Sequence, residues 1–174
     1  ALAGSDVNGT GYALAKALEA EQPDLVLLGQ QSDDGECYTI GAVVADHLRM
    51  PSLTQVIKID VEDSGLRCER QAEYGYDTVL VELPAVISVG DAINEPRYPS
   101  LKAIMGAKKK PLDTKGVGDV GIEAGRVGYD NARAHCADFK APAAKEPGRI
   151  IEDEDTNETV EQIVAWLDER KLLA

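Results

Sequence analysis

The stretch Asp24-Leu-Val-Leu-Leu-Gly29 decides the fold of this chain. Four consecutive aliphatic side chains between an acidic residue and a glycine are typical of a strand that is buried on both faces of a parallel sheet. A polar loop occupies 30–38, and apolar residues then recur at helical spacing over 39–48. A strand, a loop and a helix in this order predict a βα unit.

Helix and strand signals flank this unit on both sides. A helix capped by Ser5 or Asp6 is expected to run to about Glu19. Four β-type runs follow the unit, at residues 53–60, 66–73, 78–82 and 85–89. Turn residues separate the middle two runs, which predicts an antiparallel hairpin. The sequence therefore predicts an α/β fold, in which a parallel sheet with helices on both faces carries an antiparallel hairpin excursion.

The C-terminal part has a different character. Residues 111–149 are rich in Gly, Pro, Ala and charge without clear periodicity, so we expect an extended, poorly packed connection. A helix capped by Thr156 or Asn157 closes the chain. Its apolar stripe needs a partner surface and consists of Val160, Ile163, Val164 and Leu167. We predict an α/β domain at 1–112 and a C-terminal arm with a terminal helix at 113–174.

Composition excludes several classes of partner. A net charge of −13 and a pI near 4.5 repel nucleic acid and anionic membrane surfaces. The three cysteines have no CxxC spacing and only two histidines accompany them, so we predict no metal site. No apolar run approaches the roughly 18 residues of a membrane span, so we expect a soluble protein in reduced, cytosol-like surroundings without direct membrane insertion.

The loop from Gly29 to Gly41 is the candidate ligand site. It joins the carboxyl end of a buried strand to a helix start, which is where open α/β sheets bind nucleotides. The unpaired N–H groups near Tyr38, Thr39 and Ile40 would face a phosphate there. The loop contains neither GxGxxG nor GxxxxGK[ST], and its three acidic side chains would oppose a phosphate if they pointed inward. Plain turn chemistry remains the alternative.

Residues 94–110 carry apolar side chains that neither sheet nor core explains. Prolines break regular structure before a short helix in which Leu101, Ile104 and Met105 share one face. Three lysines follow at the helix end, where the dipole favours cations. This pattern indicates either a docking surface or an amphipathic helix that packs on its own domain.

Several of these segments together resemble the beta subunit of electron transfer flavoproteins. The matching segments are residues 4–15, 24–29, 31–41, 83–88, 94–101, 104–105 and 107–110. The similarity covers residues 1 to about 112. Relatives usually begin with further strand and helix units that precede the first residue here.

The resemblance implies a Rossmann-like fold of the adenine nucleotide alpha-hydrolase type. It also implies a heterodimer with an alpha subunit that holds the redox FAD, while the beta subunit holds AMP, or a second FAD in the electron-bifurcating branch. Such a heterodimer carries electrons from acyl-CoA or related dehydrogenases through a quinone oxidoreductase to the respiratory chain. The chain itself would be a carrier subunit without catalytic residues, in the cytoplasm or, in a eukaryote, in the mitochondrial matrix.

The resemblance also assigns roles to residues. The nucleotide-binding set would be Gly29, Gln31, Asp34, Gly35, Tyr38, Thr39, Ile40 and Thr10. The partner-binding set would be Tyr98, Leu101, Ile104 and Met105, with Leu101 as the anchor in a pocket of the dehydrogenase.

Two other functional classes compete with this one. A stand-alone adenine-nucleotide-binding module of the universal-stress type would use the apolar helix as a homodimer contact. A nucleotide hydrolase would need a lysine or a set of metal ligands near the loop, and neither is present in its sequence. His47 lies in the middle of an expected helix, and His135 has only Cys136 and Asp138 nearby in sequence. Neither histidine anchors a catalytic triad, so no catalytic residue is predicted.

Overall fold

The computed structural model describes residues 2–145, 147–148, 150–151 and 155–173. The helices are α1 (Val7–Glu19), α2 (Ile40–Leu48), α3 (Leu101–Ala107) and α4 (Thr156–Glu169). The strands are β1 (Leu25–Gly29), β2 (Ser52–Glu62), β3 (Gly65–Ala72), β4 (Gly75–Val81) and β5 (Ala85–Val89). Short 3-10 turns lie at Asp91–Ile93, Ala124–Arg126 and Tyr129–Asn131. Contacts divide the chain into two units, 1–136 and 137–174.

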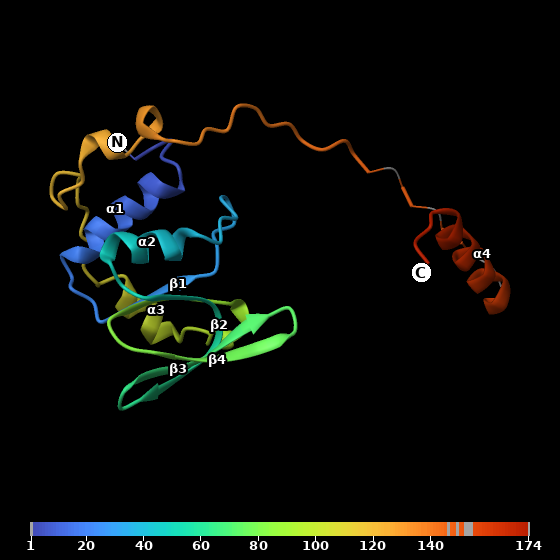
Figure 1. The fold of residues 1–174 in the computed structure, drawn as a ribbon, viewed down its shortest axis with the longest axis horizontal. Helices are drawn as coiled ribbons and strands as arrows, with labels where there is room; N and C mark the ends of the chain where they lie inside the picture. The colour runs from blue at the N-terminus through green and yellow to red at the C-terminus, as the bar shows by residue number, and fades with distance from the viewer. Residues whose placement is uncertain (1, 146, 149, 152–154, 174) are drawn as a thin grey trace. The chain divides into compact units, whose positions relative to one another are not determined.

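The first unit is an open α/β sheet (Figure 1). Its strand order is β1-β5-β2-β3-β4, in which β1, β5 and β2 are parallel. The β3–β4 hairpin pairs antiparallel and continues the same sheet from β2. Helices lie on both sides of this mixed sheet, so the predicted α/β class with a Rossmann-like parallel part is confirmed.

Strand β5, rather than β1, is the strand buried on both faces. Residues 85–88 are all buried, and Val86 packs under α2 while Ile87 packs into the cluster formed with β2, β3 and β4. In the described part of the chain β1 lies at the sheet edge, and Leu27 is 55% exposed. The sequence pattern predicted β1 as the doubly buried strand because an aliphatic run indicates apolar faces but does not reveal which strands flank it.

Helices α1 and α2 form a layer on one side of the sheet. Helix α2 packs on β5 and β2, and α1 packs on α2. The two helices approach closely at Gly11, where an added Cβ would lie 3.0 Å from Val43 Cβ. Asp6 caps α1, as one of the two predicted caps, because its carboxylate accepts the Gly9 N–H at 2.8 Å. These contacts fix the start of α1 beside the loop that follows β1.

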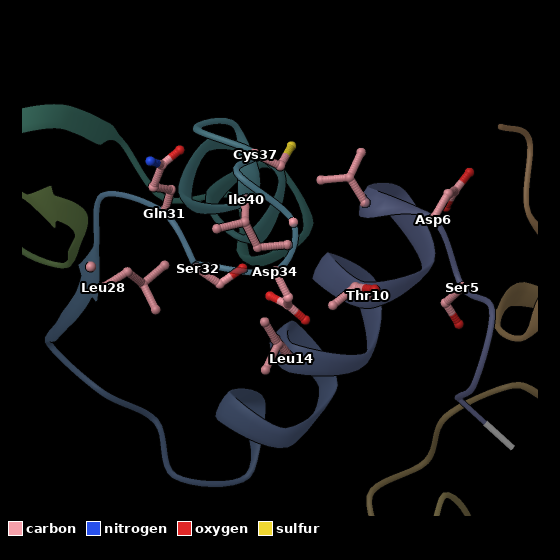
Figure 2. A pocket seen from close by; sticks show the side chains of 13 residues that line it. Ser5, Asp6, Thr10, Leu14, Leu28, Gln31, Ser32, Asp34, Cys37 and Ile40 are labelled. Carbon is pink, nitrogen blue, oxygen red and sulfur yellow. The ribbon is translucent and has the colours of Figure 1, made fainter. Parts of the chain in front are cut away.

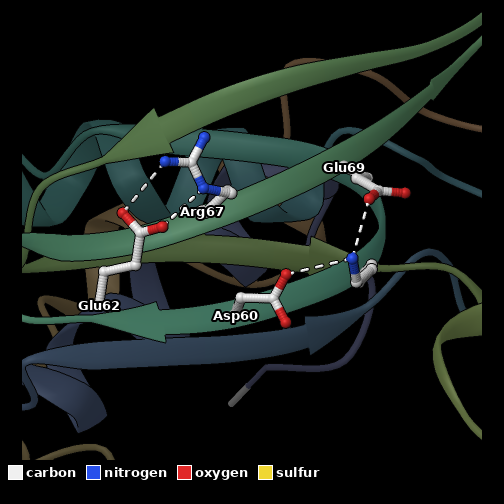
Figure 3. A network of polar contacts seen from close by, with 5 residues as sticks. Asp60, Glu62, Arg67 and Glu69 are labelled. Carbon is white, nitrogen blue, oxygen red and sulfur yellow. Dashed lines mark hydrogen bonds and ion pairs between the residues drawn. The ribbon is translucent and has the colours of Figure 1, made fainter.

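The exposed face of β2 and β3 carries ion pairs, two of them across the strands and one along β2 (Figure 3). Lys58 Nζ lies 3.2 Å from Asp60 and 3.1 Å from Glu69, and Arg67 Nε lies 2.6 Å from Glu62. Each exposed pair stabilises the sheet only slightly, because solvent screens the charges. These charged side chains alternate along the strands with side chains of the buried face. A shift of the pairing by one residue would turn the charges toward the core, so the alternation favours one antiparallel register.

Residues 117–134 are more ordered than the sequence suggested. Two 3-10 turns form there, and Val127 is only 4% exposed against Tyr12 and Ala13. This segment was expected to be poorly packed because it lacks periodicity. Its order comes from a few apolar anchors and from backbone hydrogen bonds to α1, which leave no periodic pattern in a sequence.

The second unit contains α4, whose cap is Asp155 rather than the predicted Thr156 or Asn157. The Asp155 carboxylate accepts the Asn157 N–H at 2.8 Å. Three members of the predicted stripe, Val160, Ile163 and Val164, are exposed within this unit, and the fourth, Leu167, is half-buried. On the same helix the guanidinium of Arg170 lies 4.3 Å from the centre of the Trp166 ring. Among the described residues of this unit, the helix thus presents an apolar surface and no side chain is fully buried.

Candidate functional site

A pocket of about 570 Å³ opens where β1 ends (Figure 2). Four elements form its wall: the first half of α1, the end of β1, the loop after it and the first residue of α2. The lining residues are Ser5, Asp6, Val7, Thr10, Leu14, Leu28, Gly29, Gln31, Ser32, Asp34, Gly35, Cys37 and Ile40. The volume falls within the range of small-molecule sites.

Most of the predicted nucleotide-binding residues meet in this pocket. Gly29 ends β1, Gln31, Asp34 and Gly35 come from the loop after it, and Ile40 comes from the first turn of α2. Thr10 reaches the same space from α1, as Figure 2 shows. The structure therefore brings these six residues together across 30 positions of sequence.

Tyr38 and Thr39 are not among the lining residues. Thr39 is the N-cap residue of α2, but its side chain makes no capping bond. Its Oγ1 lies 3.0 Å from Cys37 Sγ instead. The Thr39 hydroxyl and then its backbone N–H lower the pKa of the Cys37 thiol below its ordinary value. Thr39 thus acts on Cys37, which does face the pocket.

Two carboxylates contribute negative charge to the pocket wall. The Ser32 hydroxyl, followed by the backbone N–H groups of Asp34 and Gly35, lowers the pKa of Asp34. The backbone N–H groups of Gly9 and Arg133 lower the pKa of Asp6. Both groups are ionised at neutral pH, so an anionic ligand must avoid them or find them already satisfied by donors.

Apart from Thr10, the wall contributed by α1 and by the two residues before it was missed from the sequence. Ser5, Asp6, Val7 and Leu14 line the pocket, although only Ser5 and Asp6 had been singled out, and only as helix caps. A topological signal was available, because helices that flank a parallel strand run opposite to it and so begin beside its carboxyl end. The start of α1 therefore had to lie next to the loop after β1.

The predicted partner-binding residues lie on α3 and just before it, and we call them the α3 ridge: Tyr98, Leu101, Ile104 and Met105. Ser100 caps α3 by accepting the Ala103 N–H at 3.2 Å. No residue of α3 is buried, Tyr98 is 98% exposed and Leu101 is 75% exposed. The helix therefore does not pack its apolar face on its own domain.

The described residues include no group of three His, Cys, Asp or Glu side chains arranged to hold a metal ion. Among the same residues, no helix combines the length and apolar character needed to cross a membrane.

Comparisons with known proteins identify the family. Residues 1–119 match the electron transfer flavoprotein domain. The chain is 40% identical to the electron transfer flavoprotein subunit beta of Mycobacterium tuberculosis over 98% of its own length and 64% of that protein. It is 31% identical to the caffeyl-CoA reductase-Etf complex subunit CarD of Acetobacterium woodii, over 99% of its length and 66% of CarD.

The human electron transfer flavoprotein subunit beta is 40% identical over 63% of this chain and 43% of the human protein. The chain thus spans less than two thirds of the mycobacterial relative and a smaller part of the human one. The matched domain includes the whole wall of the pocket and the α3 ridge. The chain therefore belongs to the beta-subunit branch of the electron transfer flavoprotein family.

Proposed function

We propose that this chain is an electron-carrier subunit that pairs with an FAD-bearing alpha subunit and performs no bond chemistry itself. The heterodimer would take electrons from acyl-CoA or related dehydrogenases and deliver them to a quinone oxidoreductase. The observation that carries this proposal is the pocket at the end of β1, which joins the strand, the loop and two helix starts in one space. Family membership supplies the redox context.

The pocket is proposed to hold the adenine nucleotide, either AMP or the AMP half of a second FAD. The apolar side chains of Val7, Leu14 and Leu28 suit a base or ribose face. The start of α2 at Ile40 offers backbone N–H groups and a partial positive charge to a phosphate. AMP and FAD both carry an adenosine and a phosphate, so the ligand that occupies the pocket must be identified by measurement.

The α3 ridge is proposed to dock on the dehydrogenase. Leu101 stands on a capped helix between prolines and lysines, so little conformational entropy is lost when a partner pocket buries it. The lysines at 108–110 give this surface a local positive charge on an acidic chain. A partner with an apolar pocket and an acidic rim would complement it.

Purification with the alpha subunit tests the proposal. The chain is expressed together with its genomic neighbours, the visible spectrum of the complex is recorded, and the nucleotides released by heat are identified. We expect a flavin spectrum and a stoichiometric adenine nucleotide. A chain that purifies with adenine nucleotide but without a flavin-bearing partner would favour the stand-alone nucleotide-binding module.

A matched pair of variants places the nucleotide. Thr10→Phe introduces a large side chain from α1 into the pocket and should abolish nucleotide retention. Glu19→Phe introduces the same side chain at an exposed position of α1 outside this pocket and should leave retention unchanged. Equal nucleotide content in both variants would exclude this pocket as the site.

A further inference from the structure

Residues 122–134, which we call the clasp, close over the start of α1. The Arg126 guanidinium lies 3.7 Å from the centre of the Tyr12 ring, and the Glu123 N–H donates to Tyr12 Oη at 3.2 Å. Val127 packs on the same tyrosine and is almost fully buried. A single buried aromatic side chain of α1 thus anchors the first half of the clasp by packing, a cation–π contact and a hydrogen bond.

The second half of the clasp binds two residues of the pocket wall. The Gly128 N–H donates to Ser5 Oγ at 2.7 Å, and Gly128 has the positive φ of 85° that a glycine tolerates best. The Arg133 N–H and the Ala134 N–H donate to Asp6 Oδ2 at 2.7 and 3.3 Å. These bonds span more than 120 residues of sequence, so they depend on the clasp keeping its shape.

Both carboxylate oxygens of Asp6 are therefore occupied by backbone donors. Oδ1 accepts the Gly9 N–H within α1, and Oδ2 accepts the two N–H groups of the clasp. Figure 2 shows the Asp6 carboxylate directed away from the centre of the pocket, although the residue belongs to its wall. Without the clasp, Oδ2 would lose both donors, and only the Gly9 N–H would hold the carboxylate in its outward position against the pocket interior.

We infer that the clasp is a positioning element for the nucleotide pocket: by holding the Asp6 carboxylate outward, it lets the pocket accept a phosphate-bearing ligand. This inference rests on the proposed nucleotide binding and adds a specificity mechanism to it. The clasp contributes no group to the ligand. It acts through Asp6, whose like charge would otherwise repel a phosphate.

Asn131 offers a way to loosen the clasp without touching the pocket. Its Nδ2 donates to the Ala124 carbonyl at 3.2 Å and to the Val127 carbonyl at 2.9 Å, which holds the two halves of the clasp together. Asn131→Ala removes both bonds. Arg126→Met, which keeps an aliphatic side chain on Tyr12 but removes the cation, provides a second and milder variant. Asn157→Ala, in the second unit, is the matched control.

The experiment compares AMP with adenosine, which lacks the phosphate. Titration calorimetry on the nucleotide-depleted complex with the alpha subunit gives the dissociation constant of each ligand. We expect Asn131→Ala to weaken AMP binding roughly tenfold or more, because an unscreened like charge nearby has at least that effect, and to change adenosine binding little. The double variant Asp6→Asn/Asn131→Ala should recover AMP binding, because an amide at the helix cap carries no charge.

The outcomes separate the inference from the proposal on which it rests. Equal weakening of AMP and adenosine, or no rescue by Asp6→Asn, would mean that the clasp only supports the fold and would overturn the inference alone. Unchanged AMP binding in both Asn131→Ala and Arg126→Met would also overturn it. A wild-type complex that binds neither AMP nor FAD in this pocket would overturn the proposed function and the inference together.

Discussion

The sulfur of Cys37 lies 3.0 Å from the hydroxyl oxygen of Thr39, at the point where the loop after β1 enters α2. This contact joins a pocket-lining thiol to the cap residue of the helix, and it lowers the pKa of the thiol. A larger thiolate fraction near neutral pH makes Cys37 a chemical probe of the pocket.

Alkylation of Cys37 should report nucleotide occupancy. Iodoacetamide should modify Cys37 with a pH midpoint below that of an ordinary cysteine, and Thr39→Val should move the midpoint upward because the first donor is lost. Bound AMP should slow alkylation at Cys37 and leave exposed Cys136 unaffected. Peptide mass spectrometry follows both sites in one sample. Equal protection of Cys136 would indicate a general effect rather than occupancy of the pocket.

Leu101→Ala should weaken electron transfer from the dehydrogenase. Truncation of an interface anchor costs about 2 kcal/mol or more, which is roughly a thirtyfold loss of affinity. Leu112→Ala is the control, because Leu112 is 92% exposed and lies outside the α3 ridge. Stopped-flow reduction of the heterodimer at varied dehydrogenase concentration measures the effect. A loss of thermal stability with unchanged transfer kinetics would place Leu101 in a structural role.

Val164→Asp should impair assembly with the alpha subunit. The stripe on α4 is exposed within its unit, and a charge in its middle opposes burial by a partner. Ala165→Asp introduces the same charge one residue later, outside the stripe, and should assemble normally. Size-exclusion chromatography of the co-expressed subunits distinguishes the two results. Normal heterodimer formation by Val164→Asp would show that α4 is not an interface.

Ile87→Ala should destabilise the first unit by about 2–5 kcal/mol, the usual cost of removing a large aliphatic side chain from a core. Ile87 is fully buried on β5, which lies between β1 and β2. Val61→Ala, at an exposed position of β2, should change stability by less than about 0.5 kcal/mol. Urea denaturation followed by circular dichroism gives both values. Similar midpoints for the two variants would contradict the assignment of β5 as the strand buried on both faces.

The sequence predicted where helices and strands lie along the chain better than it predicted which elements pack beside one another. The bounds of α3 follow from Pro99, the Ser100 cap and the terminal lysines, all of which act locally, and the observed helix begins at Leu101 as expected. The exposure of β1 could not be predicted, because it depends on which strand lies on each side. The same limit applies to β4, which begins at Gly75, three residues before the predicted start, because cross-strand pairing with β3 extends it.

The candidate site also has one part that a local sequence pattern predicts and one part that depends on long-range contacts. The loop after β1 was predicted from a local pattern of strand, turn and helix cap. The clasp was not, because its bonds join Ser5 and Asp6 to residues more than 120 positions away through backbone N–H groups. Every residue except proline has the same backbone N–H donor, so no residue type in 122–134 indicates this contact.

The position of Trp166 on α4 makes the terminal helix optically distinct from the rest of the molecule. It is the single tryptophan of the sequence, and it is partly exposed, with Arg170 over its ring. Tryptophan emission of this chain therefore comes from α4 alone, because the sheet and the pocket contain no tryptophan. A partner that covers the helix should shift this emission to shorter wavelength, and a flavin brought near it should quench it by energy transfer. Docking of the terminal helix can thus be timed without any label.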